Sequence, residues 1–151
     1  MTYSAVIVDD EPPARTKLVR FIAELEDFRV AAEASSVEEA VAAVRDTTPD
    51  VLFLDIQLGS HSGFEVIDGL KETASPLIVF TTAYSEYAVK AFELQALDYL
   101  LKPFDRDRFL RSIERTRAAL AEPDRSDVRG HSTKKKQNDS CAECELGPPP
   151  L

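Results

Sequence analysis

The sequence predicts an α/β fold in which helices cover both faces of a five-stranded parallel sheet. Five short apolar runs alternate with five segments of helical periodicity, and alternation at these lengths is typical of a parallel sheet. The apolar runs are nearly continuous, as expected for strands that are buried on both faces. A chain of 151 residues is long enough for one domain with a sizeable core.

The chain opens with a strand, a helix and a second strand. The first strand is expected at Tyr3–Val8, where alternation gives way to a continuous apolar run. Pro12 and Pro13 follow, and proline is favoured in the first turn of a helix. A short second strand is expected at Val30–Ala34. The helix between the strands is predicted to pack through Leu18, Phe21, Ile22 and Leu25.

The second helix begins with a capping box at Ser36–Glu39. A break at Thr47–Asp50 separates it from the third strand, Val51–Leu54, whose large apolar side chains indicate burial on both faces. Gly59–Gly63 is a turn or loop by composition. A third helix follows, with one apolar face made by Phe64, Val66, Ile67 and Leu70.

The last two strands are expected at Leu77–Phe80 and Tyr99–Leu101. Ser85 can cap the helix between them, and Asp105 can cap the helix that ends the domain. The fourth helix has Ala88, Val89, Ala91 and Phe92 on one face. The fifth is predicted to pack through Phe109, Leu110, Ile113 and Leu120.

The composition changes after residue 121. Only six of the thirty residues at 122–151 are hydrophobic, so burial cannot repay the entropy of ordering this segment. We therefore expect a domain at 1–121 and a polar, flexible linker or tail at 122–151. Cys141 and Cys144 have the C-x-x-C spacing, but there is no second pair, and His131 would supply at most a third ligand, so no zinc site is expected. Lys134–Lys136 is read as part of a solvated linker.

Charge and hydropathy exclude several classes of function. The net charge of −9 argues against direct binding of nucleic acid or an anionic membrane by the domain, and it is compatible with an acidic cation site. No apolar run approaches the length of a membrane span, and the first residues lack the features of a signal peptide. These observations predict a cytoplasmic protein without membrane contact.

The polar residues of interest lie just past the carboxyl ends of predicted strands. They are Asp9, Asp10, Asp55, Thr82 and Lys102. In a parallel sheet these ends share one edge, so the side chains are expected to converge. Three converging carboxylates repel one another unless a cation or protons intervene, and oxygen ligands suit Mg²⁺. A carboxylate can itself accept a phosphoryl group as a nucleophile.

Each of these residues also has an ordinary structural interpretation. Asp55 can cap the next helix, Thr82 can be a strand-end hydroxyl, and Lys102 can be a solvated charge. Glu11 suits the positive end of a helix and needs no chemical role. His61 follows Asp55 closely, but a surface loop histidine is the favoured interpretation. The five strand-end positions occur in register, and this pattern favours a shared site.

The order and spacing of four motifs resemble the receiver domain of two-component response regulators over roughly residues 1–120. The motifs are Val8-Asp9-Asp10-Glu11, Leu54-Asp55-Ile56, Thr82-Ala83 and Tyr99-Leu100-Leu101-Lys102-Pro103. The segments at 10–15, 84–93 and 96–103 resemble the subgroup with a LytTR-type DNA-binding output domain (LytR/AlgR-like). The resemblance implies a doubly wound, flavodoxin-like (CheY-like) sheet with strand order 2-1-3-4-5.

The resemblance also implies roles for individual residues. Asp55 would be the phosphoacceptor, with phosphate supplied by a sensor histidine kinase. Mg²⁺ would be bound by Asp10 and Asp55, by the backbone carbonyl of Gln57, and by Asp9 directly or through water. Lys102 would pair with the phosphoryl group, and the peptide bond between Lys102 and Pro103 would be cis. The protein would be a phosphoacceptor with slow autodephosphorylation, rather than a classical enzyme.

The same resemblance implies a switch. Thr82 would move to hydrogen-bond the new phosphate, and Tyr99 would turn inward, where simple packing is the ordinary alternative for an aromatic residue. Gln57 and Tyr84 occupy positions that tune the lifetime of the aspartyl phosphate. The face made by the fourth helix, fifth strand and fifth helix, with Tyr87 and Phe92, would then drive homodimerisation. Transcription would be regulated through an output domain that is missing from this chain, without direct DNA contact by the receiver.

Three other interpretations remain open at this stage. A haloacid-dehalogenase-like phosphatase also uses a nucleophilic Asp and Mg²⁺, but it requires a second Asp where this chain has Gln57. A receiver that ignores phosphate would act through protein contacts alone, which the complete acidic cluster argues against. A stand-alone receiver would accept phosphate but act by protein contact instead of through an output domain.

Overall fold

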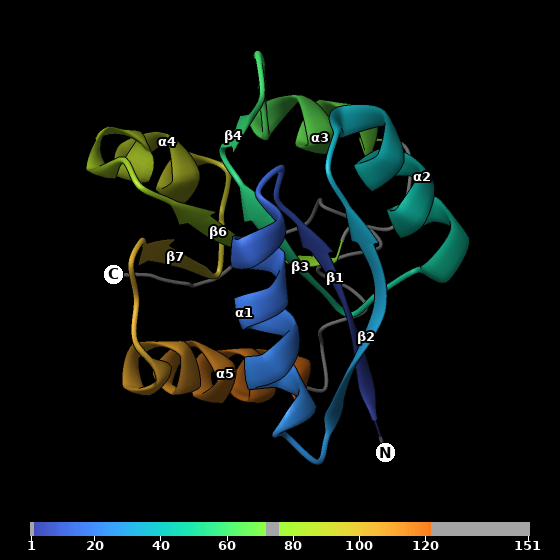
Figure 1. Cartoon of the computed structure of the whole chain (residues 1–151), viewed down its shortest axis with the longest axis vertical. Helices are drawn as coiled ribbons and strands as arrows, with labels where there is room; N and C mark the ends of the chain where they lie inside the picture. Colours follow the sequence, from blue (N-terminus) through green and yellow to red (C-terminus); the bar gives the residue numbers. More distant parts are fainter. Residues whose placement is uncertain (1, 72–75, 122–151) are drawn as a thin grey trace, which may run out of the picture. The chain divides into compact units, whose positions relative to one another are not determined.

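The computed structural model describes residues 2–71 and 76–121, and the predicted tail at 122–151 lies outside these ranges. Five parallel strands form one sheet in the order β2-β1-β3-β6-β7 (Figure 1). The strands are β1 (Tyr3–Val8), β2 (Phe28–Ala34), β3 (Val51–Asp55), β6 (Leu77–Thr82) and β7 (Asp98–Leu101). The predicted doubly wound order is therefore confirmed.

Helices cover both faces of this sheet. They are α1 (Pro12–Ala23), α2 (Val37–Thr47), α3 (Phe64–Gly69), α4 (Ala88–Glu93) and α5 (Arg106–Leu120). One hydrophobic cluster packs the sheet against α1 and α5, and a second packs it against α2, α3 and α4. Within the described residues, no helix combines the length and apolarity needed to cross a bilayer.

Alternation along the central strands explains why there are two cores. On β1, Val6 and Val8 belong to the cluster under α2–α4, whereas Ala5 and Ile7 belong to the cluster under α1 and α5. All four side chains are at most 1% exposed. Because successive side chains of a strand point to opposite faces, a continuous apolar run supplies both cores at once.

Several predicted helix starts are confirmed. Two prolines occupy the first turn of α1. The Ser36 hydroxyl accepts a hydrogen bond from the Glu39 N–H at 3.2 Å. The reciprocal half of the capping box is shifted by one residue, because the Glu39 carboxylate accepts from Ser35 N at 2.9 Å. Asp105 accepts from the Arg108 N–H at 2.8 Å, as expected for the cap of α5.

One local prediction holds only in part, and another was wrong. The turn or loop predicted at Gly59–Gly63 contains a turn at Gly59 and Ser60, but it belongs to a short antiparallel hairpin formed by β4 (Gln57–Leu58) and β5 (His61–Ser62). Ser85 opens a 3-10 turn, η1 (Ser85–Tyr87), without capping through its side chain, and α4 follows this turn.

The predicted apolar face of α4 also does not turn inward as a whole. Only Ala91 is buried, whereas Val89 and Phe92 are 68% and 71% exposed. A six-residue helix lies over too little of the sheet to bury a full apolar stripe. The apolar side chains of α4 are therefore available on the surface.

Candidate functional site

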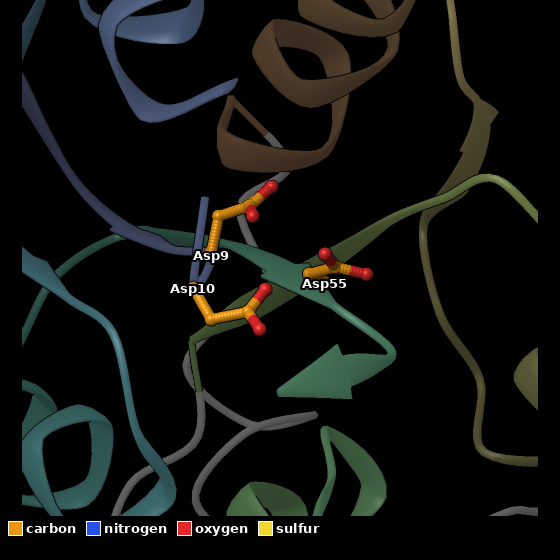
Figure 2. A group of neighbouring side chains, drawn as sticks. All are labelled: Asp9, Asp10 and Asp55. Carbon is orange, nitrogen blue, oxygen red and sulfur yellow. The ribbon is translucent and has the colours of Figure 1, made fainter. Parts of the chain in front are cut away.

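Three carboxylates meet at the carboxyl edge of the sheet. Figure 2 shows Asp9 and Asp10 at the turn after β1, with Asp55 facing them from the end of β3. One oxygen from each residue lies within 4.8 Å of the others. Asp9 and Asp55 are buried, at 0% and 5% exposure, whereas Asp10 is exposed. The sheet order thus brings Asp10 close to Asp55, which lies 45 positions later in the sequence.

Lys102 supplies a cation to this cluster from the end of β7. Its Nζ lies 2.7 Å from Asp9 Oδ2 and 3.0 Å from Asp55 Oδ2. Burial disfavours the ammonium, but the hydrogen bond to Asp9 and the charges of Asp55 and Asp9 outweigh it and raise the pKa of Lys102. When ionised, the three carboxylates carry more negative charge than the single Lys102 ammonium can balance. Such a set of hard oxygen donors fits a divalent cation of the Mg²⁺ type.

The pKa of Asp55 is raised to about 6 from its ordinary 3.8. Burial is the main cause, and the charge of Asp9 adds to it. The Gln57 N–H, which donates to Asp55 Oδ1 at 3.1 Å, and the Lys102 charge act in the opposite direction. Asp55 is therefore ionised at neutral pH but more basic than an exposed carboxylate. This combination suits a nucleophile.

The turn that carries Asp9 and Asp10 is held by hydrogen bonds on several sides. The Asp9 N–H donates to the Ala34 carbonyl at 3.0 Å, and Asp9 Oδ1 accepts from Glu11 N at 2.9 Å. Asp10 Oδ2 accepts from Gly59 N at 2.9 Å. Gly59 has φ +63°, a left-handed conformation that glycine adopts readily. The β4–β5 hairpin is therefore tied to the acidic cluster.

Thr82 and Lys102 are joined through the backbone. Thr82 ends β6 and is fully buried, and its carbonyl accepts from the Lys102 N–H at 2.7 Å. Its hydroxyl accepts from Tyr84 N at 3.2 Å. The Lys102–Pro103 peptide is cis, as the resemblance implied.

Tyr99 connects this edge of the sheet with the surface of β7. Its ring packs against the core under α2–α4, and its hydroxyl donates to the Tyr84 carbonyl. Tyr84 is 43% exposed. In this segment, Thr82 therefore contacts Lys102, and Tyr84 contacts Tyr99.

Two predicted candidates lie at the margin of the site. Gln57 begins β4, its side chain is exposed, and its N–H faces Asp55. His61 has a side chain that is 58% exposed and lies 3.4 Å from Glu65, at the other strand of the hairpin. His61 is not part of the three-carboxylate group, in agreement with the surface interpretation.

Sequence reasoning missed three residues that support the site. A Cβ at Gly63 would lie 2.2 Å from the Asp55 carbonyl oxygen, so only glycine fits there. Arg15 donates to the Asp9 carbonyl, and Lys17 donates to the Phe104 carbonyl in the loop after Lys102, each at 2.5 Å. Arg15 lies in the 10–15 segment that resembles the LytTR subgroup, but neither cation has a local pattern that indicates which backbone carbonyl it binds.

Comparison with known proteins agrees with this geometry. Residues 5–114 match the family described as "Response regulator receiver domain". The chain is similar to the transcriptional regulatory protein BtsR of Escherichia coli K12, with 46% identity over 119 residues, covering 79% of this chain and 50% of BtsR. It is also similar to the sensory transduction protein LytT of Bacillus cereus, with 42% identity over 111 residues, covering 73% of this chain and 45% of LytT. The chain thus spans about half the length of these curated relatives.

Solved structures show the same likeness. The response regulatory domain of mrkE from Klebsiella pneumoniae has a TM-score of 0.70 at 31% identity, covering 77% of this chain and 96% of that one. The REC domain of AraT, a response regulator from Geobacillus stearothermophilus, has a TM-score of 0.71 at 29% identity, covering 80% of this chain and 96% of that one.

Proposed function

The chain belongs to the response regulator receiver family, with relatives of the LytTR type, and we propose that it is a switch that accepts a phosphoryl group on Asp55. The observation that carries this proposal is the environment of Asp55: a buried carboxylate, 3.0 Å from Lys102 Nζ, that shares its site with Asp9 and Asp10. The phosphoryl donor is a phosphohistidine of a sensor histidine kinase in the cytoplasm.

Asp9, Asp10, Asp55 and the backbone carbonyl of Gln57 would hold Mg²⁺. When bound, this ion supplies positive charge that neutralises the oxygens of the transferring phosphoryl group. The fit rests on the donor set, because three carboxylates converge and a single ammonium leaves their charge only partly balanced.

The chain's own residues orient the nucleophile. The Gln57 N–H holds Asp55 Oδ1, and the Lys102 ammonium holds Asp55 Oδ2, so the carboxylate is fixed in direction before the reaction. An Asp55 oxygen forms the new bond to phosphorus as the bond from phosphorus to the histidine nitrogen breaks, and its electron pair stays on the imidazole. Lys102 then pairs with the new phosphoryl oxygens.

Thr82 and Tyr99 would relay the change. The Thr82 hydroxyl, which accepts from Tyr84 N in this structure, would turn to donate to the phosphoryl group. Release of the Tyr84 N–H would let the backbone at Tyr84 move, and the Tyr84 carbonyl accepts from the Tyr99 hydroxyl. Phosphorylation adds about −1.5 to −2 charges and new acceptors, enough to bias such a two-state segment. Gln57 and Tyr84 supply no acid near the phosphoryl position, which favours slow hydrolysis.

The output would be homodimerisation through α4, β7 and α5. Four large apolar side chains are exposed on or beside α4 and β7: Val89, Phe92, Leu94 and Leu101. Tyr87 and Tyr99, which are partly buried against the core under α2–α4, would belong to the same face. Because the chain spans about half of BtsR and LytT, we propose that transcription is regulated through a further domain, with no DNA contact by the receiver.

Mass spectrometry of the intact protein tests the assignment of Asp55. After incubation with a small phosphodonor and Mg²⁺, the wild-type chain should gain one phosphoryl group, and Asp55→Asn should gain none. Asp68→Asn, which changes an exposed acid on α3, is the matched control and should be labelled like wild type. Equal labelling of wild type and Asp55→Asn would overturn the proposed function.

A further inference from the structure

Arg15 reaches from α1 back to the turn that carries two of the three carboxylates. Its Nη1 donates to the Asp9 carbonyl at 2.5 Å, and its Nε lies 3.4 Å from Glu33 Oε1 on β2. The Arg15 side chain is 21% exposed, whereas that of Glu33 is 46% exposed. The guanidinium is thus held against the backbone of the turn, and its ion pair with Glu33 lies nearer the solvent.

The carbonyl that Arg15 binds belongs to the peptide that joins Asp9 to Asp10. The direction of this peptide decides where the Asp10 side chain points. Asp9 is held independently by burial, by Glu11 N and by Lys102. Asp10 is exposed, and its Oδ2 accepts from the Gly59 N–H of a separate hairpin, so its position depends strongly on the backbone that precedes it.

We propose that Arg15 is a positioning residue for divalent-cation binding: by anchoring the Asp9 carbonyl, it keeps Asp10 directed at Asp9 and Asp55. This inference rests on the proposed metal site and deepens it. Arg15 acts through the backbone and does not itself touch the cation or the reacting atoms.

The sign of the effect separates positioning from simple electrostatics. A nearby positive charge repels a divalent cation, so removing the Arg15 charge would strengthen cation binding if charge were its only effect. Loss of positioning acts in the opposite direction, because outer-shell partners of metal ligands typically contribute about 10- to 100-fold in affinity. A weaker cation affinity after charge removal therefore identifies the positioning role.

Titration with Mn²⁺ alone, followed by the electron paramagnetic resonance signal of the free ion, measures this affinity without phosphotransfer. In the full chain, Arg15→Met should weaken Mn²⁺ binding about 10-fold. Arg15→Lys keeps the charge but loses the planar fork of donors, so it should recover only part of the affinity. Both variants should give folded circular dichroism spectra, because Arg15 lies outside the two cores.

Two matched variants complete the test. Arg20→Met removes an exposed cation from the same helix, and Glu33→Gln removes the ion pair but leaves the carbonyl contact. Neither should weaken Mn²⁺ binding. Unchanged or tighter binding by Arg15→Met, or equal weakening by Glu33→Gln, would overturn the positioning role and leave the proposed function intact. Failure of the wild-type chain to bind Mn²⁺ would overturn both.

Discussion

The three carboxylates of the cluster differ because their surroundings differ. Asp9 and Asp55 are both buried, and each accepts from a backbone N–H and from the Lys102 ammonium, whereas Asp10 is exposed. Asp55 is buried and has a pKa raised to about 6. Burial, together with the Asp9 charge, therefore makes ionisation costly at Asp55, the residue proposed to react.

This cost predicts that Asp55→Asn stabilises the metal-free protein at pH 7. The pKa of Asp55 in the folded protein lies above its ordinary value of 3.8. The preference of the fold for the protonated carboxyl therefore stabilises the protein fully below about pH 3.8, and this stabilisation is lost as the pH rises through about 6. Asn resembles the neutral acid, and we expect an increase in unfolding free energy of about 2 kcal/mol at pH 7.

Urea denaturation in the presence of a chelator measures this difference. It should shrink at pH 4, where the wild-type carboxyl is protonated, and also when Mg²⁺ is added, because the cation stabilises only the wild-type site. A variant that is less stable than wild type at pH 7 would contradict the raised pKa.

At the scale of the elements, an ion pair locks β7 to α5. Asp98 begins β7 and is 6% exposed. Both of its carboxylate oxygens accept from Arg108 of α5, at 2.9 and 3.1 Å. Arg108 also donates to the Tyr99 carbonyl at 3.2 Å. This pair therefore fixes the backbone of the proposed switch residue relative to α5.

Breaking the pair should destabilise the domain. Burial favours the neutral form of Asp98, but the Arg108 hydrogen bonds, the Tyr99 N–H and the Arg108 charge outweigh it and lower the pKa. We expect Asp98→Asn to lower the unfolding free energy by about 2 kcal/mol at pH 7, because Arg108, whose side chain is only 31% exposed, loses its charged partner.

The pH dependence of stability provides a second check on this pair. A lowered pKa gives stability that is present above the ordinary value of 3.8 and is lost as the pH falls through the folded value. The gap between wild type and Asp98→Asn in denaturant titrations should therefore close below pH 3.8. Asp107→Asn, at an exposed position in the first turn of α5, should have little effect, and a loss of the same size there would contradict the assignment.

At the scale of the whole receiver unit, one segment, from Thr82 to Tyr84, links the acidic edge of the sheet with the apolar surface of α4 and β7. Thr82 lies at one end of this segment, and the Tyr84 carbonyl holds Tyr99 at the other. The short α4 leaves Phe92 at 71% exposure. An exposed apolar surface near the proposed phosphoacceptor suits an interface that is controlled by phosphorylation.

We therefore predict that Phe92→Ser weakens dimerisation of the phosphorylated chain. Burial of one aromatic side chain contributes about 1.5–3 kcal/mol, so the dimer dissociation constant should rise about tenfold or more. Sedimentation velocity after treatment with phosphodonor and Mg²⁺ measures this constant. Arg20→Ser, at an exposed position on α1, which is not part of the proposed interface, should leave it unchanged. An unaltered constant for Phe92→Ser would exclude this face as the interface.

Much of the fold and of the acidic cluster was predictable from local patterns. Strand positions such as Val51–Leu54 followed from apolar runs, and helix starts at Pro12 and Ser36 followed from local capping rules. Asp9, Asp10 and Asp55 were recognisable because the carboxyl ends of parallel strands share one edge. These features depend on residues that are near each other in the chain or on a general property of parallel sheets.

The remaining features depend on contacts between distant residues. Gly63 is required because α3 begins against the Asp55 carbonyl, and the exposure of Phe92 follows from the small area that α4 covers. Arg15 and Lys17 look alike in the sequence, yet they bind the backbones of different loops. Burial and the surrounding charges set the pKa of Asp55. Periodicity reports which way a side chain faces, whereas its partners and its dielectric surroundings are set by how the elements pack.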